Sequence, residues 1–495
     1  MARLHFFTTA SLGALALFAG CTVGPDYHLP AVTTPPSWGE IPMGAAAATA
    51  PSVATASAAT LTAWWSTLGD RHLDSLIARA VESNLDLRLA SARLAEARAQ
   101  RGTVTADQYP SVNTKGSYTR ERYSANSPFG AFLPQKEYDE FQAGFDANWE
   151  VDLFGRVRRS VEAANADTAS AVEDRRDALV SLLAEVARDY VDLRTAQRRL
   201  AIAQQNLASQ RATLELVQIR RDTGAVGDLD VTRSQAQVRD TEASLPPLRR
   251  QARENIHALS VLLGREPNAL SAELEAAGPI PVVPPEVPVG APADVLRRRP
   301  DVRRAERQLA AATARIGVAT ADLYPRLSLT GSFTLDATEF SKFGDWSSRA
   351  FNVGPTLTWP VFDAGRIRST IHVADARQQQ ALSHYEQTVL IAFREVEDAL
   401  VGYATEQSRR AGLAASLESA RKSVDLANDQ YKAGAVDLLV VLDAQRTQFA
   451  AEDLLALSDR AVTTYLVTLY KALGGGWDAD PTTFAEKVRS GSVNP

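Results

Sequence analysis

The chain has 495 residues, of which 45% are apolar and 23% are charged, so it can bury a large hydrophobic core. Its formal net charge of −6 gives no reason to expect a nucleic-acid partner. The sequence has no GxxxxGKS or GxxxxGKT loop for nucleotide phosphates, and its six histidines include no pair at metal-ligand spacing. We therefore expect neither an enzyme nor a metal site.

Residues 1–20 have the pattern of an export signal peptide. An early positive charge precedes an apolar run over 6–18, and two small residues stand directly before Cys21, the only cysteine of the chain. This pattern predicts a lipidated segment over 21–75 that begins at Cys21 and carries an N-palmitoyl chain and an S-diacylglycerol as membrane anchors. Thr22 follows in place of the aspartate that retains lipoproteins at the inner membrane, which favours the outer membrane. The alternative is a secreted protein with an incidental cysteine.

The mature chain is a duplication. The segment Asp86–Thr119 returns 215 positions later as Asp301–Thr334, and the match resumes at an offset of 210 from Trp149 and Trp359 onward. A unit of this length is a whole module, since solenoid repeats run to only about 50 residues. We expect two repeats and a C-terminal tail, whose ranges are 76–290, 291–475 and 476–495.

Each repeat has two segments in which apolar and polar residues alternate, as expected of strands with one apolar face. They lie at about 110–120, 140–151, 325–335 and 350–361. A tilted strand crosses the hydrocarbon core of a bilayer in about 9 to 11 residues, with aromatic residues at the rims. Trp149 and Trp359 suit such rims, so we expect membrane strands; half-buried strands of a soluble sandwich are the alternative.

Each repeat also predicts an antiparallel helical hairpin, at about 157–263 and 367–473. A segment without glycine or proline precedes Gly224, and its apolar residues recur at helical spacing. A helix over that length is on the order of 100 Å long, which no compact globule contains. Gly224 and Gly434 mark the hairpin tips, and Pro246-Pro247 is expected to break the first return helix. Helices alone would also suit a cytosolic coiled-coil scaffold.

Four strands per chain cannot close in lipid, because open strand edges are not tolerated there and single-chain barrels start at about eight strands. Two chains would give eight strands around a filled interior, whereas three would give twelve around a channel. We therefore expect a mostly α-helical homotrimer with a shared 12-stranded membrane β-barrel and a long antiparallel α-helical tunnel. No segment after Cys21 has 18 consecutive apolar residues, so the strands are the predicted membrane element.

Four motifs together resemble the NodT/OprM group of TolC-like channels, the outer membrane factor lipoproteins of resistance-nodulation-division (RND) multidrug efflux systems. The motifs are Cys21 to Tyr27, Trp149 to Arg156, Pro360 to Arg366 and Leu473 to Trp477. The resemblance implies a homotrimer in the outer membrane of a Gram-negative bacterium that extends into the periplasm. It also implies docking of a periplasmic adaptor at the tips around Gly224 and Gly434, and an inner-membrane RND transporter that supplies the energy.

The same resemblance implies a gate near the tips at Asp230, Tyr431, Asp443 and Arg446. Val436 and Val440 stand where some members have an arginine and a further aspartate, so the sequence departs from the full constriction pattern there. Independently of the resemblance, Asp443 would form a ring of three carboxylates around a threefold axis. A local pair with Arg446, three residues on, is the alternative.

These features predict a passive exit duct for drugs and other small molecules, gated at the periplasmic helix tips. A duct for type I protein secretion is the second hypothesis, because it uses the same architecture. A structural envelope spacer without a pore is the third.

Overall fold

The computed structural model describes residues 22–39, 53–55, 61–128, 131–132, 134–135 and 137–478. The predicted signal peptide, the lipidation residue Cys21 and all but the first residues of the predicted tail lie outside the described residues.

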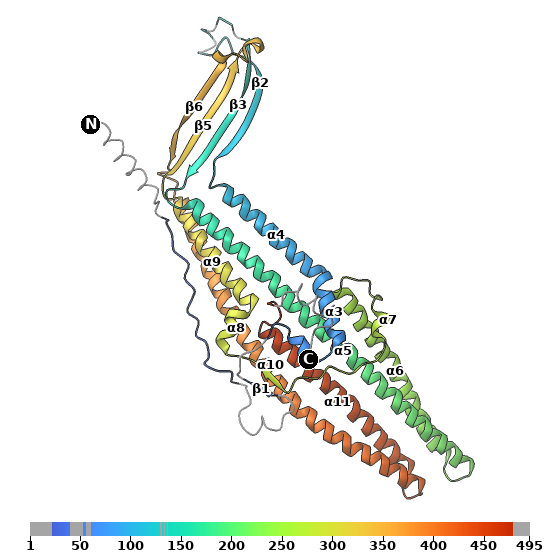
Figure 1. Ribbon diagram of the computed structural model, residues 1–495. Coiled ribbons are helices and arrows are strands. Elements are labelled where there is room, and N and C mark those ends of the chain that lie inside the picture. The colour runs from blue at the N-terminus through green and yellow to red at the C-terminus, as the bar shows by residue number, and fades with distance from the viewer. Residues whose placement is uncertain are drawn as a thin grey trace. The chain divides into compact units, whose positions relative to one another are not determined.

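The first repeat contributes two long strands and two long helices (Figure 1). Before it lie β1 (Val53–Thr55) and η1 (Trp64–Leu68), and α3 (Arg71–Ser83) spans its start. Its further elements are α4 (Leu85–Ala106), β2 (Ser111–Arg122), β3 (Glu137–Val151), α5 (Arg156–Asp222), α6 (Asp228–Leu262), α7 (Ser271–Leu274) and β4 (Glu286–Pro288). The second repeat has the same series. Its elements are α8 (Pro292–Arg298), α9 (Pro300–Ala321), β5 (Arg326–Ala337), η2 (Phe340–Lys342), η3 (Trp346–Ser348), β6 (Arg349–Thr358), α10 (Arg366–Lys432) and α11 (Leu438–Ala472).

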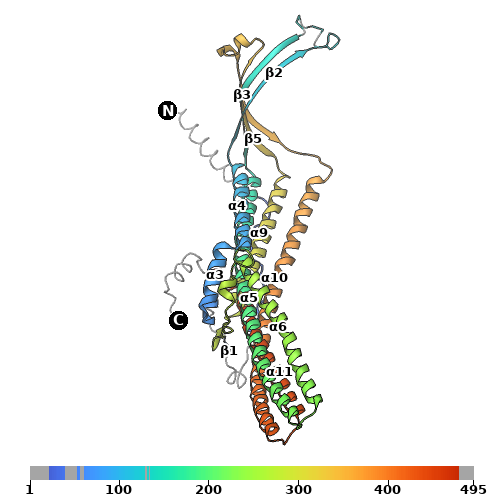
Figure 2. The same ribbon diagram turned by 90° about the vertical axis from the view of Figure 1, so that its right-hand side faces the viewer.

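The four long strands form one antiparallel sheet in the order β2-β3-β5-β6, as Figure 1 shows, and Figure 2 shows the strands in a view turned by 90°. The alternation seen in the sequence sets its two faces, because side chains of a strand point to opposite sides in turn. Phe145, Phe333 and Phe351 are cross-strand neighbours in one row, and all three are largely exposed in the single chain. Strand β6 ends at Thr358, three residues before the predicted end, because Pro360 has no N–H for the ladder.

The long helices have matching lengths in the two repeats. α5 and α10 have 67 residues each, and the return helices α6 and α11 have 35 each. At 1.5 Å per residue, the longer helices are on the order of 100 Å long. The expected hairpins are therefore present. None of the helices in the described ranges combines the length and the apolar character that crossing a membrane requires.

The prediction that Pro246 and Pro247 break the first return helix is wrong. α6 continues through both prolines. Leu245 and Leu248, on either side of them, are buried in a hydrophobic cluster with Leu207 of α5. The two prolines lack the N–H groups that a helix interior uses, and their low helix propensity opposes the helix. The packing of the leucines on either side of them offsets this cost.

Two compact units are present, and neither coincides with a repeat. One contains the described residues up to Ala31 together with Arg93–Val172 and Arg304–Glu386, and it includes the sheet. The other contains Val32–Ala92, Glu173–Arg303 and the described residues from Gln387 onward, and it includes the hairpin tips. Each unit therefore combines corresponding parts of both repeats.

The C-terminal Leu-Gly-Gly-Gly-Trp motif closes the core of the second unit. Trp64 is 1% exposed and stacks on Tyr470 at 5.1 Å between ring centroids. The chain turns beneath it at Gly476, whose φ of +98° and close approach to Leu183 leave no space for a side chain. Trp477 then donates its indole N–H to the Arg298 carbonyl at 2.9 Å. The motif therefore has a packing role in this fold.

Candidate functional site

Both hairpin tips begin with the same hydrogen-bond pattern. Gly224 follows α5 with a φ of +77°; its N–H donates to the Arg221 carbonyl, and the Ala225 N–H donates to the Arg220 carbonyl, both at 2.8 Å. This is a Schellman ending, in which a left-handed residue satisfies the last carbonyls of a helix. Gly434 follows α10 with a φ of +75° and an equivalent pair of bonds. The two predicted tip glycines are thus required by the backbone and are exposed.

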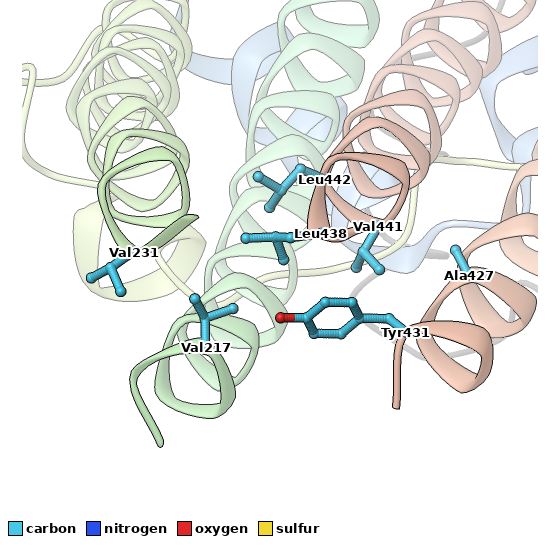
Figure 3. Close-up of a cluster of buried hydrophobic side chains, with 7 residues drawn as sticks. All are labelled: Val217, Val231, Ala427, Tyr431, Leu438, Val441 and Leu442. Atoms are coloured by element: carbon cyan, nitrogen blue, oxygen red, sulfur yellow. The ribbon is translucent and has the colours of Figure 1, made fainter. Parts of the chain in front are cut away.

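Behind the tips, a small hydrophobic cluster joins all four long helices. It consists of Val217 of α5, Val231 of α6, Ala427 and Tyr431 of α10, and Leu438, Val441 and Leu442 of α11. Figure 3 shows the Tyr431 ring extending from α10 towards Val217. Tyr431 is only 4% exposed, and its hydroxyl has no hydrogen-bond partner among the described residues. This predicted gating residue therefore acts mainly as an apolar contact between the hairpins.

The side chain of Arg220 on α5 contacts both the backbone and the ring of Tyr431. Its Nη1 donates to the Tyr431 carbonyl at 2.8 Å, and its guanidinium lies 4.6 Å from the centroid of the Tyr431 ring. The Tyr431 carbonyl also accepts from the Gly434 N–H at 3.0 Å, and it lies in the last turn of α10, where the carbonyl end of a helix carries a partial negative charge. A cation of one hairpin is thus bound at the helix end of the other. Arg220 was not among the site residues predicted from the sequence, although a basic residue in the last turn is a known signal of a helix end.

Asp443 and Arg446 form the local pair that the sequence left open. Arg446 Nη2 donates to Asp443 Oδ1 at 2.5 Å, and both side chains are well exposed, at 71% and 61%. They line a shallow groove of about 680 Å³ on α10 and α11, beside Leu439 and Val440. An exposed ion pair of this kind contributes little to stability. Its carboxylate remains available for a second role.

Asp230 lies in the first turn of α6, beside Asp228. Negative charge is favourable there, because the N-terminus of a helix carries a partial positive charge. The Asp230 carboxylate has no side-chain hydrogen bond or ion pair within the part of the chain that the structure describes. The fold thus brings Tyr431 to the inter-hairpin cluster, places Asp443 and Arg446 together on α11, and leaves Asp230 separate from both.

Two long helical hairpins joined to a four-stranded antiparallel sheet form the protomer architecture of a TolC-like outer membrane channel, as expected. The chain belongs to the outer membrane efflux protein family: the family model described as "Outer membrane efflux protein" matches residues 76–265 and 291–475.

Named relatives support the same assignment. The chain is 35% identical to outer membrane protein OprJ of Pseudomonas aeruginosa, over 97% of each chain. It is 31% identical to nodulation protein T of Rhizobium leguminosarum bv. trifolii, over 93% of this chain and 96% of that protein. The solved structure of the outer-membrane channel OprN superposes with a TM-score of 0.85 at 38% identity, covering 92% of this chain and all of that one.

The resemblance to the NodT/OprM group is therefore confirmed, as is the location in the Gram-negative outer membrane with an extension into the periplasm. The chain is an outer membrane channel component of an efflux system. Members of the family are channel proteins and not enzymes.

Proposed function

We propose that three copies of this chain assemble into a passive exit duct for drugs and other small molecules, closed at the ends of the helical hairpins. The observation that carries this proposal is the contact between the hairpins behind the tips, where the hydrophobic cluster around Tyr431 and the bond from Arg220 to the Tyr431 carbonyl tie the second hairpin to the first. A contact between two hairpins can be broken without unfolding either of them. It therefore provides a closed state that a partner can open.

The count of strands supports the trimer. The chain supplies four long strands in an open sheet, and three chains supply twelve, enough to surround a channel. The row of exposed phenylalanines would face lipid. The lipid anchors proposed at Cys21, an N-palmitoyl chain and an S-diacylglycerol, would add a second attachment to the membrane.

We propose a periplasmic adaptor and an inner-membrane RND transporter as partners, with the adaptor docking around Gly224 and Gly434. The exposed surface at both tips leaves these positions accessible in the chain. The relatives support this type of assembly: one is named as the outer membrane protein of a solvent efflux pump of Pseudomonas putida. Energy for export would come from the transporter.

Asp443 is the proposed constriction carboxylate. It lies beside the groove on α10 and α11, paired with Arg446. In a threefold assembly, three such carboxylates would favour cations at the narrowest point. Asp230 is proposed to act at the tip of the first hairpin, through the N-terminus of α6.

Two measurements test the proposal. Purified protein in planar bilayers should conduct ions, and the absence of any conductance would favour a spacer without a pore. Deletion of the gene should raise cellular drug accumulation while the secreted proteome stays unchanged. Unchanged drug accumulation together with loss of an exported protein would instead support type I secretion.

A further inference from the structure

Five polar side chains follow one another along α5 at intervals of seven residues. Seven residues are close to two helical turns, so these positions share one face of the helix. They are Asp192, Arg199, Asn206, Thr213 and Arg220.

Each of the five contacts the second hairpin. The contacts are Asp192 with Arg460, Arg199 with Asp453, Asn206 with Glu452, Thr213 with Gln445, and Arg220 with the Tyr431 carbonyl. The partners on α11 occur in the reverse order along the chain, as antiparallel helices require. We call this line of contacts the inter-hairpin seam.

The end of the seam away from the tips consists of two ion pairs. Arg199 donates to Asp453 through Nε at 2.6 Å and Nη2 at 3.0 Å. Arg460 likewise makes two bonds to Asp192, one of them from Nη2 at 3.1 Å. All four side chains are partly buried. Two-point pairing of an arginine with a carboxylate is the strongest polar contact that such side chains form.

Between Asn206 and the charged Arg220 contact at the tips, the seam consists of neutral and incomplete contacts. Gln445 donates to the Thr213 hydroxyl at 2.9 Å. Gln210 lies between this contact and Asn206 and is only 2% exposed, yet neither atom of its amide has a partner among the described residues. It interrupts the apolar row of Leu207 and Leu214. A buried amide without a partner weakens the closed arrangement at this level.

Glu452 lies opposite Asn206, between the ion pairs of the seam and its neutral contacts. It is 7% exposed, and its Oε2 accepts from Asn206 of the first hairpin at 3.2 Å. Its Oε1 accepts from Arg421 at 3.0 Å and from Gln448 at 3.2 Å, both within the second hairpin. The carboxylate is therefore satisfied largely by its own hairpin. Separation from the first hairpin would cost it one bond to a neutral amide.

We propose that the seam is a hinge that Arg220 holds closed at the tips and that is weak between Arg220 and Asn206. The second hairpin separates from the first between the tips and Asn206, while the ion pairs of Arg199 and of Asp192 stay closed and act as the pivot. The inference rests on the proposed function, because it assigns the moving and the fixed parts of the same gate. It assigns Asn206 and Glu452 as the positions at which opening stops.

Two matched substitutions test the position of the pivot. Asn206→Asp places a carboxylate against Glu452, and Arg199→Glu places one against Asp453 at the neighbouring level and also removes the ion pair. Arg199→Glu is therefore the larger perturbation of the two. In planar bilayers, Asn206→Asp should raise the open fraction of the channel about tenfold or more, the effect of repulsion between buried like charges. Arg199→Glu should leave the open fraction near the wild-type value and lower the thermal unfolding temperature. Asn206→Asp with Glu452→Gln, which reverses the amide and the carboxylate, should return the channel towards closure.

Three results would overturn the hinge. Equal opening by the two variants would mean that the whole seam separates. An unchanged open fraction in Asn206→Asp would remove the seam from the gate, and failure of the reversed pair to close the channel would show that the effect is not local. If Asn206→Asp does not assemble, Thr213→Val and Asp453→Asn make the same comparison with smaller changes. A wild-type protein without conductance would instead overturn the proposed function.

Discussion

Arg220→Met should release the second hairpin from the first at the tip. The variant keeps an unbranched side chain of similar reach but loses the charged donor to the Tyr431 carbonyl and the cation over its ring. A hydrogen bond with a charged partner contributes about 1.5 kcal/mol at the low end of its range, and a partly solvated cation over an aromatic ring contributes about 0.5 kcal/mol. The low values apply because Arg220 is only half-buried.

The sum, about 2 kcal/mol per chain, corresponds to about a 30-fold shift towards the open state, since 1.4 kcal/mol is tenfold. The assay is the open fraction of single channels in planar bilayers. Arg221→Met is the matched control, because Arg221 pairs with Asp222 and Asp228 within its own hairpin. If both variants had the same open fraction, the contact between Arg220 and Tyr431 would not hold the gate.

Three further predictions concern the constriction, the backbone and the core. Asp443→Ala should raise single-channel conductance, and an unchanged conductance would remove Asp443 from the closure. Gly434→Ala should lower the free energy of unfolding by about 1 kcal/mol because its φ is positive, whereas Gly412→Ala, in open space within α10, should raise it by up to about 1 kcal/mol; thermal melts compare the two. Burial beside Asp70 raises the pKa of Asp74 to about 6. Because the folded-state pKa is raised, protonation of Asp74 stabilises the fold, and this stability is lost as the pH rises from about 4 to 6. Asp74→Asn should therefore raise the free energy of unfolding at pH 7 by about 1 kcal/mol, a value reduced for solvent screening. The melting temperature of the variant should vary less between about pH 4 and 6 than that of the wild type.

The large elements could be predicted from the sequence because their patterns are long. A long segment without proline and with at most two glycines, followed by Gly224 or Gly434, leaves few alternatives to a helix with a left-handed end. The alternation in the strands is equally explicit, because a shift by one residue would exchange the two faces. The break expected at Pro246 failed because local propensity does not contain the packing of Leu245 and Leu248.

The site was predicted less completely. Asp443 and Arg446 lie three residues apart on one helix, so their pairing follows from the sequence. Arg220 and Tyr431 lie 211 positions apart, and no local rule brings an arginine of one helix to a particular carbonyl of another. The seven-residue spacing from Asp192 to Arg220 was available in the sequence, but an apolar period is easier to recognise than a polar one superimposed on it.

The order of the sheet has a consequence for biogenesis. Its outer strands, β2 and β6, each offer one side of their backbone to a partner that the described chain does not supply. The twelve-residue β2 is exposed throughout. Such edges pair readily with other chains, correctly or not. The newly exported chain should therefore be a substrate for periplasmic chaperones. Its strands should become resistant to proteolysis only as subunits associate, so resistance should rise with the concentration of the chain itself.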